Sequence, residues 1–198
     1  PEPIFKEISG LYKNNIKFPN PKPAKIFLLC PVGTVGAGKT TVIKPLSEKL
    51  NLARVSTDEI RKILKERGFN YNRARELVFG VTKELVEEGY GVAIDANCGG
   101  DKTSEEKIRE LQNKYGIDVV WVHVNPPESF IVNKLKHYKH DWLFKNGDEA
   151  VSAYFKYKEK YGNFENLNLP YVYTFDTSKP NIKEQVEEAV EIIKSLEK

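Results

Sequence analysis

The chain has 198 residues and a formal net charge of +3, with 40% hydrophobic and 30% charged residues. This length suits one compact domain, and the composition is too apolar for a disordered tail and too polar for a membrane protein. The small positive charge is not the strong basic excess that indicates a nucleic-acid-binding surface, although the 31 basic residues divide unevenly into 25 Lys and 6 Arg.

Residues 1–24 contain five prolines and at most a short helix at residues 4–13, so we expect an N-terminal appendage to a domain at residues 25–198. In that domain, short apolar runs predict buried strands at residues 26–30, 53–57, 92–95, 117–124 and 171–175. Helical spacing between them predicts helices at residues 40–50, 58–67, 71–88, 103–115, 126–138, 148–160 and 182–196. This alternation predicts an α/β fold, in which helices cover both faces of a five-stranded parallel sheet.

A glycine-rich loop follows the first predicted strand and precedes a predicted helix. It has the sequence GTVGAGKT, which is the Gly-x-x-x-x-Gly-Lys-Thr pattern of a phosphate-binding loop. Such a loop points backbone N–H groups at phosphate oxygens, while its lysine bridges the outer phosphates and its threonine ligates magnesium. The alternative, a glycine-rich turn with a chance lysine, would not require the flanking strand and helix. We therefore predict nucleoside triphosphate binding, with ATP as the ligand, at Gly33, Gly36, Ala37, Gly38, Lys39, Thr40 and Thr41.

Two carboxylates follow predicted strands of this sheet. Asp95 ends the third strand, where a side chain faces the ligand crevice, and we assign it with Thr40 to magnesium; its alternative role is a cap of the strand end. Asp58 follows the second strand and has Arg61 three residues later on the same helical face. Asp58 could accept the proton of an attacking hydroxyl beside Arg61 and Lys39, or it could simply cap the helix.

Four segments together resemble the P-loop kinases of the polynucleotide kinase and zeta-toxin type, which are also described as AAA-like ATPases. They are GTVGAGKTT at residues 33–41, STDEIR at 56–61, VAIDAN at 92–97 and, more weakly, FDTS at 175–178. The resemblance spans residues 25–198 and implies a three-layer sandwich with strand order 2-3-1-4-5 and a helical lid at about residues 134–148. It also implies that Asp58 is the general base, that Arg61 supports the acceptor site and that Asp95 lies on the magnesium and acceptor side.

Two features depart from that family. The asparagine at Asn97 comes one position earlier than in the family pattern, so we give it no role. The family's lid supplies arginines to the phosphates, whereas no arginine follows Arg109 here. The lid instead offers Lys134, Lys136, Lys139 and Lys145, with His137 and His140 nearby, and we assign phosphate contacts to Lys136 and Lys139. The alternative for each lysine is a solvated helix face, and a lysine lacks the fork with which arginine spans two phosphate oxygens.

The sequence thus predicts an ATP- and magnesium-dependent phosphotransferase that acts on a hydroxyl. A polynucleotide 5′ end or a nucleotide-like acceptor is slightly favoured over a small sugar. The alternatives are a small-metabolite or zeta-toxin-like nucleotide-sugar kinase, and a nucleotide-binding switch with negligible transfer. We expect no membrane segment, because the longest apolar runs are far shorter than the roughly 18 residues of a spanning helix. Two cysteines form neither a disulfide framework nor a metal-binding spacing, so a cytoplasmic protein is the expectation.

Overall fold

The computed structural model describes residues 3–22, 25–139, 143–162, 164 and 167–196. Its centre is a five-stranded sheet with the order β2-β3-β1-β4-β5, in which every neighbouring pair is parallel. The strands are β1 (Phe27–Val32), β2 (Ala53–Ser56), β3 (Val92–Asp95), β4 (Asp118–Val124) and β5 (Tyr171–Phe175). The predicted strand order and the parallel arrangement are therefore confirmed.

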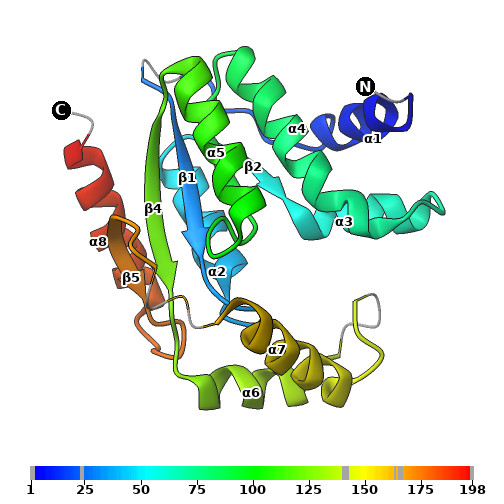
Figure 1. Cartoon of the computed structure of the whole chain (residues 1–198). Helices are drawn as coiled ribbons and strands as arrows, with labels where there is room; N and C mark the ends of the chain where they lie inside the picture. The colour runs from blue at the N-terminus through cyan, green and yellow to red at the C-terminus, as the bar shows by residue number, and fades with distance from the viewer. Residues whose placement is uncertain (1–2, 23–24, 140–142, 163, 165–166, 197–198) are drawn as a thin grey trace.

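Helices cover both faces of the sheet (Figure 1). In chain order they are α1 (Pro3–Lys13), α2 (Lys39–Lys49), α3 (Thr57–Glu66), the short 3-10 helix η1 (Tyr71–Arg73), α4 (Ala74–Glu87), α5 (Lys102–Tyr115), α6 (Glu128–Lys136), α7 (Gly147–Tyr161) and α8 (Ile182–Leu196). None of the helices in the described ranges combines the length and the apolar character that crossing a bilayer requires.

The strand side chains divide between two hydrophobic cores. Leu28 and Cys30 of β1 belong to one core, together with side chains from α1, α3, α4 and α5. Phe27 and Leu29 of the same strand belong to the other, with side chains from α2 and α8. Because successive strand residues point to opposite faces, a continuously apolar run such as that of β1 suits a strand buried on both sides.

The N-terminal helix α1 packs against α3 and α4 rather than standing apart from the domain. Ile8 and Tyr12 are fully or almost fully buried, with 0% and 2% exposure, and they belong to the same core as β1 and α4. The ring of Phe5 lies so close to Gly80 of α4 that a Cβ there would be 2.0 Å from the ring. A glycine in the middle of α4 thus lets α1 approach closely.

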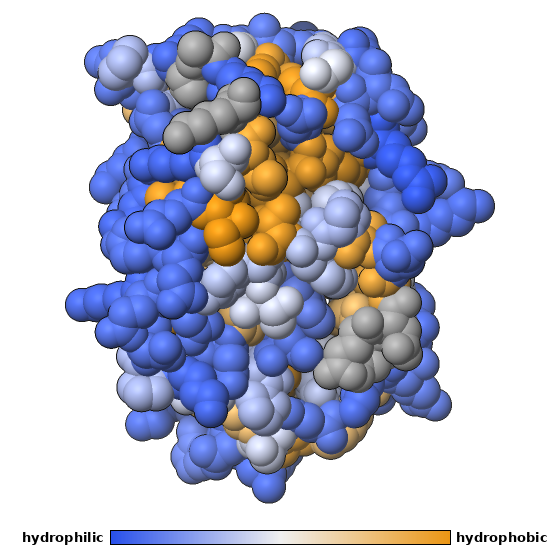
Figure 2. All heavy atoms as spheres, turned by 90° about the vertical axis from the view of Figure 1, so that its left-hand side faces the viewer, coloured by the Kyte–Doolittle hydropathy of each residue, from blue (hydrophilic) through white to orange (hydrophobic). Residues whose placement is uncertain are grey.

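Helices α6 and α7 lie beyond the carboxyl ends of the strands, where Figure 1 shows them below the sheet. They pack against each other, and the predicted lid at residues 134–148 spans the end of α6 and the start of α7. His140 falls outside the described residues. On another side of the molecule, where β4, β5 and α8 lie, Figure 2 shows apolar side chains gathered at the surface, and Ile192 and Leu196 of α8 are 39% and 54% exposed.

Candidate active site

A cavity of about 470 Å³ opens at the carboxyl ends of β1 and β3. It is lined by the phosphate-binding loop, by the first turns of α3, by the segment after β3 and by α6. The residues to which the sequence assigns catalytic or magnesium-binding roles line this one cavity: Lys39, Thr40, Asp58, Arg61 and Asp95. Three separate sequence segments are therefore brought together at one edge of the sheet, as expected for ligand sites of open parallel sheets.

The phosphate-binding loop joins β1 to α2 and depends on its glycines. Gly36 and Gly38 have φ angles of 79° and 92°, a left-handed conformation that glycine adopts without steric cost. Gly33 leaves no room for a side chain, because a Cβ there would lie 2.6 Å from the backbone oxygen of Val124. The loop thereby delivers the chain directly into the N-terminus of α2, where unpaired N–H groups and the helix dipole favour an anion.

Lys39, the first residue of α2, is folded onto the loop. Its Nζ donates hydrogen bonds to the backbone oxygens of Gly33, at 3.0 Å, and Thr34, at 2.8 Å. Burial lowers the pKa of Lys39 to about 8, while the carboxylates of Asp95 and Asp58 oppose that shift. The ammonium group is therefore held inside the loop, where the phosphates of a bound nucleotide would provide stronger partners.

Thr40 and Asp95 form the pair to which the sequence assigns magnesium. The Thr40 hydroxyl donates to Asp95 Oδ1 at 2.9 Å, and Arg54 Nη1 donates to Asp95 Oδ2 at 2.6 Å. Burial raises the pKa of Asp95, while Arg54 is the main influence that lowers it. Hydroxyl and carboxylate oxygens are the ligands that Mg²⁺ prefers, so the donors present fit this ion, directly or through bound water.

Asp58 and Arg61 lie together on the first turns of α3. Arg61 Nη1 donates to Asp58 Oδ1 at 3.0 Å, whereas Arg61 Nε is buried and has no hydrogen-bond partner in the described part of the chain. The N-cap of α3 is Ser56, whose hydroxyl accepts from the backbone N–H of Glu59 at 3.4 Å. Asp58 is therefore not the residue that caps this helix, and its carboxylate faces the cavity.

The structure gives Asn97 a place that the sequence analysis did not. Its Oδ1 accepts from the backbone N–H of Gly33 at 3.0 Å, and its Nδ2 donates to the Gly99 oxygen at 2.6 Å and to the Tyr157 hydroxyl at 3.1 Å. Asn97 therefore ties the start of the phosphate-binding loop to the segment after β3 and to α7. The family pattern has its asparagine one position later and therefore did not predict this role for Asn97.

Thr177 and Arg75 are two further contributors that sequence reasoning missed. The Thr177 hydroxyl donates to the backbone oxygen of Ala37 at 2.7 Å, so the segment after β5 supports the phosphate-binding loop from outside. Arg75 lines the cavity from α4, pairs with Asp101 and donates from Nε to the Ser104 hydroxyl at 2.9 Å. The weak FDTS match contained Thr177, but nothing in the local sequence marked Arg75.

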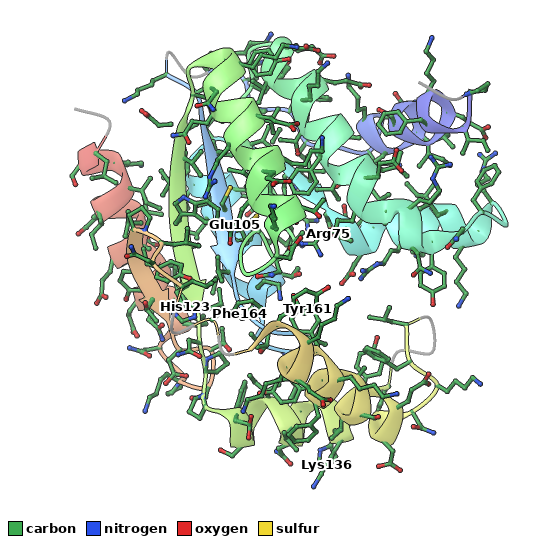
Figure 3. All side chains as sticks on the ribbon, viewed as in Figure 1. Arg75, Glu105, His123, Lys136, Tyr161 and Phe164 are labelled. Atoms are coloured by element: carbon green, nitrogen blue, oxygen red, sulfur yellow. The ribbon has the colours of Figure 1, made fainter. Side chains whose placement is uncertain are left out.

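Among the lid lysines, Lys134 is the one that reaches the cavity. Its Nζ lies 3.4 Å from the Gly36 oxygen, and burial lowers its pKa. The structure does not bring Lys136 or Lys139 to the cavity wall, and both are exposed. Lys136 lies on the outer side of α6, away from the sheet (Figure 3). Two residues along a helix turn a side chain by about 200°, so Lys134 and Lys136 face opposite sides.

The cavity contains two arginines, Arg61 and Arg75, although the lid was expected to leave the site without any from that segment. The described lid residues contain none, as the sequence shows, but both of these arginines line the cavity from α3 and α4. The guanidinium groups thus come from the helices beside β2 and β3 instead of from the lid.

The chain is similar to several known kinases. Shikimate kinase from Sulfurihydrogenibium sp. (strain YO3AOP1) is 28% identical over 148 residues, which cover 70% of this chain and 84% of that protein. Among solved structures, the APS kinase of Mycobacterium tuberculosis in complex with AMPPNP and APS superposes with a TM-score of 0.58 at 17% identity, covering 87% of this chain and 99% of that one.

A gluconokinase from Sinorhizobium meliloti 1021 superposes with a TM-score of 0.57 at 15% identity, covering 88% of this chain and 94% of that one. These structural matches confirm the predicted P-loop fold. The model of the family described as AAA domain matches residues 28–151, more than half of the chain. With its phosphate-binding loop and sheet order as described, this chain belongs to the AAA domain family.

Proposed function

We propose that this protein is an ATP- and magnesium-dependent kinase that transfers the γ-phosphoryl group to a hydroxyl of a small metabolite. One observation carries the proposal: a single cavity combines Lys39 of the phosphate-binding loop, the Thr40 and Asp95 oxygens, and the Asp58 carboxylate beside Arg61. Nucleotide binding alone would need the first two of these groups. Transfer to a hydroxyl would also need a base for the hydroxyl proton, and the Asp58 carboxylate beside Arg61 can supply it in the same cavity.

The residues that line the cavity divide the tasks of this reaction among them. The loop N–H groups and Lys39 hold the phosphates of ATP. Asp58 accepts the proton of the attacking hydroxyl as its oxygen bonds to the γ-phosphorus, while the bond from that phosphorus to the bridging oxygen breaks and ADP leaves. Arg61 orients Asp58 and places a positive charge beside the transferred group. Magnesium, when bound, neutralises the charge that develops on the phosphate oxygens.

Two observations support a small acceptor. The cavity has a volume of about 470 Å³, within the range of small-molecule pockets, and helices α6 and α7 stand over it. The similar kinases described above are named for shikimate, APS and gluconate, which are small molecules. A polynucleotide 5′ end, which the sequence analysis slightly favoured, has no support from these relatives.

The direct test is to incubate the protein with γ-labelled ATP and magnesium and with parallel pools of hydroxy acids, sugars, nucleosides and 5′-hydroxyl oligonucleotides. Label in a small metabolite would support the proposal. Label in the oligonucleotides alone would overturn the acceptor class but keep the kinase. Label only in free phosphate would overturn the kinase and favour the nucleotide-binding switch or a weak ATPase.

The role of Asp58 is tested separately by Asp58→Ala. Loss of the general base is expected to lower the transfer rate by roughly 10²–10⁴-fold, while ATP affinity changes little. Glu66→Ala is the matched control, because Glu66 is an acidic residue of the same helix whose ion pair with Lys62, at 3.9 Å, is exposed. Equal transfer rates in the two variants would exclude Asp58 as the base.

A further inference from the structure

The side chain of Tyr12, near the end of α1, places a hydroxyl group between β2 and α3. The residue is 2% exposed, and its hydroxyl accepts a hydrogen bond from the backbone N–H of Ser56 at 2.7 Å. The same hydroxyl donates to Glu59 Oε2 at 3.1 Å and lies 3.3 Å from the Arg54 backbone oxygen. Burial raises the pKa of Tyr12, so the hydroxyl keeps its proton and serves as donor and acceptor at once.

From Tyr12 a continuous series of polar contacts leads into the active site. Glu59, which accepts from Tyr12, also pairs with Arg54. Arg54 donates to Asp95 Oδ2 at 2.6 Å, and the other oxygen of Asp95 accepts from Thr40 at 2.9 Å. We call these five side chains, Tyr12, Glu59, Arg54, Asp95 and Thr40, the polar relay. The relay begins in the N-terminal helix and ends at the magnesium-binding pair.

Packing alone does not require this hydroxyl. A phenylalanine would fill nearly the same space, whereas a buried hydroxyl costs free energy unless its hydrogen bonds are made. Those of Tyr12 go to Ser56, the N-cap of α3, and to Glu59 in the first turn, on either side of Asp58. Tyr12 thus contacts both the start of the helix that carries Asp58 and the acid that orients Arg54.

The rest of α1 is anchored on α4 and on the end of α3, where Glu7 pairs with Arg67 at 3.3 Å. Ser9 donates to Glu84 at 3.0 Å, and Lys13 forms ion pairs with Glu84, at 3.4 Å, and Glu88, at 2.5 Å, where α4 ends. Contacts to α4 and to the end of α3 therefore hold α1 in place, and the Tyr12 hydroxyl bonds β2 and the start of α3. The arrangement connects residues 3–13 to a site from which they are distant in sequence.

We propose that Tyr12 is a positioning residue, which acts through Glu59 and Arg54 to orient Asp95 at the magnesium pair and through Ser56 to orient α3. This inference rests on the proposed function, because it assigns α1 a part in the geometry of that same site. Tyr12 is separated from Asp95 by the side chains of Glu59 and Arg54, so it can affect the reaction only by aligning these residues. Replacement of a residue that hydrogen-bonds a metal ligand lowers metal affinity or activity by about 10–100-fold. We expect a smaller loss of magnesium affinity, roughly 3–10-fold, for Tyr12→Phe, because Tyr12 acts through two further side chains.

The experiment compares Tyr12→Phe with Tyr115→Phe in the full chain. Tyr115 also bonds a glutamate, Glu87, but it lies at the far end of α5, outside the relay. Tyr12→Phe should raise the magnesium concentration needed for half-maximal ATP binding by roughly 3–10-fold and lower the rate of phosphate transfer by a similar factor. ATP binding without magnesium should stay as in the wild type. Tyr115→Phe should change none of these quantities.

A second variant separates positioning from a general loss of stability. Glu59→Gln weakens the next step of the relay, so its effect and that of Tyr12→Phe should not multiply in the double variant. Hydrogen exchange at the Ser56 amide should accelerate in Tyr12→Phe and stay unchanged in Glu59→Gln, because the Ser56 amide donates to Tyr12. Identical magnesium dependence in Tyr12→Phe and Tyr115→Phe, or fully multiplicative effects, would overturn the inference.

Failure of the proposed function would look different. If the wild-type protein binds ATP with magnesium but phosphorylates no acceptor, the kinase proposal fails, and the magnesium dependence of ATP binding still decides the role of Tyr12. If transfer occurs and Tyr12→Phe matches Tyr115→Phe, the kinase proposal stands and the positioning role is wrong. Absence of magnesium-dependent ATP binding in the wild type would overturn both.

Discussion

Arg54 and Asp95, on the neighbouring strands β2 and β3, form an ion pair in which Nη1 lies 2.6 Å from Oδ2. The Asp95 side chain is 3% exposed and that of Arg54 is 19% exposed, so the pair is largely shielded from water. The guanidinium compensates a carboxylate whose burial would otherwise be costly, and it leaves the second oxygen of Asp95 directed at Thr40.

We predict that Arg54→Met destabilises the protein by about 3–5 kcal/mol, because removing one partner leaves the Asp95 carboxylate buried without its guanidinium. Urea denaturation followed by tryptophan fluorescence measures this loss. Arg109→Met is the control, since Arg109 is 71% exposed and lies 4.0 Å from Glu105. An exposed pair of this kind should contribute less than about 1 kcal/mol. Similar losses in the two variants would show that the Arg54 pair is not important for stability.

Thr177→Ala should weaken ATP binding, because the Thr177 hydroxyl bonds the Ala37 oxygen and helps to hold the phosphate-binding loop. Loss of one such hydrogen bond is worth about 1 kcal/mol, which corresponds to roughly fivefold in affinity if the loop relaxes. Isothermal titration calorimetry measures the change. Ser178→Ala provides the comparison, since the Ser178 hydroxyl donates to Asp176 within its own turn, at 2.6 Å, instead of to the phosphate-binding loop. An equal loss of affinity in Ser178→Ala would contradict the prediction.

Gly33→Ala and Gly10→Ala should have opposite effects on stability. A Cβ at Gly33 would lie 2.6 Å from the Val124 backbone oxygen, so the loop must shift. We expect this shift to lower the free energy of unfolding by about 1–3 kcal/mol and to weaken ATP binding at least about tenfold. Gly10 lies inside α1 with no atom near its Cβ position. Alanine there should stabilise by about 0.5–1 kcal/mol through its higher helix propensity. Thermal unfolding with and without ATP tests both, and a neutral Gly33→Ala would contradict the steric argument.

Lys134→Ala should slow phosphate transfer, whereas Lys136→Ala should not. Lys134 lines the cavity beside Gly36, and Lys136 lies on the opposite side of α6 (Figure 3). Removing a cation that faces the transferred phosphates is expected to cost roughly 10–100-fold in turnover. Steady-state kinetics, with the acceptor that the labelling experiment identifies, distinguishes the two variants. Greater loss in Lys136→Ala would mean that the lid rearranges when ATP binds.

Much of the fold follows from local sequence patterns. The apolar runs predicted all five strands to within two residues at either end, because a strand buried on both faces leaves a continuous apolar stretch. The order of the strands was implied by the family resemblance and not by the strands themselves. The helix predicted at residues 71–88 begins instead with a 3-10 turn at Tyr71–Arg73, followed by α4.

For the site, too, local sequence patterns predict some features and tertiary packing decides the others. Motif spacing predicts Lys39 and Thr40, and the end of an apolar strand predicts Asp95, since the strand, loop or helix that carries each of them also places it. Spacing could not distinguish Lys134 from its neighbour Lys136, because the outcome depends on which face of α6 meets the loop. It also could not tell that Ser56, not Asp58, caps α3.

By itself, the sequence determined the phosphate-binding loop, the alternation of strands and helices, and the acidic residues at the strand ends, because these depend on contacts within short segments. Only the tertiary structure decided which partners those residues meet. Arg54 with Asp95, Tyr12 with Ser56 and Asn97 with Gly33 join segments at least 40 residues apart. Such pairs form when packing of the two cores brings distant segments together and buried polar groups must find partners there, so no local pattern could have predicted them.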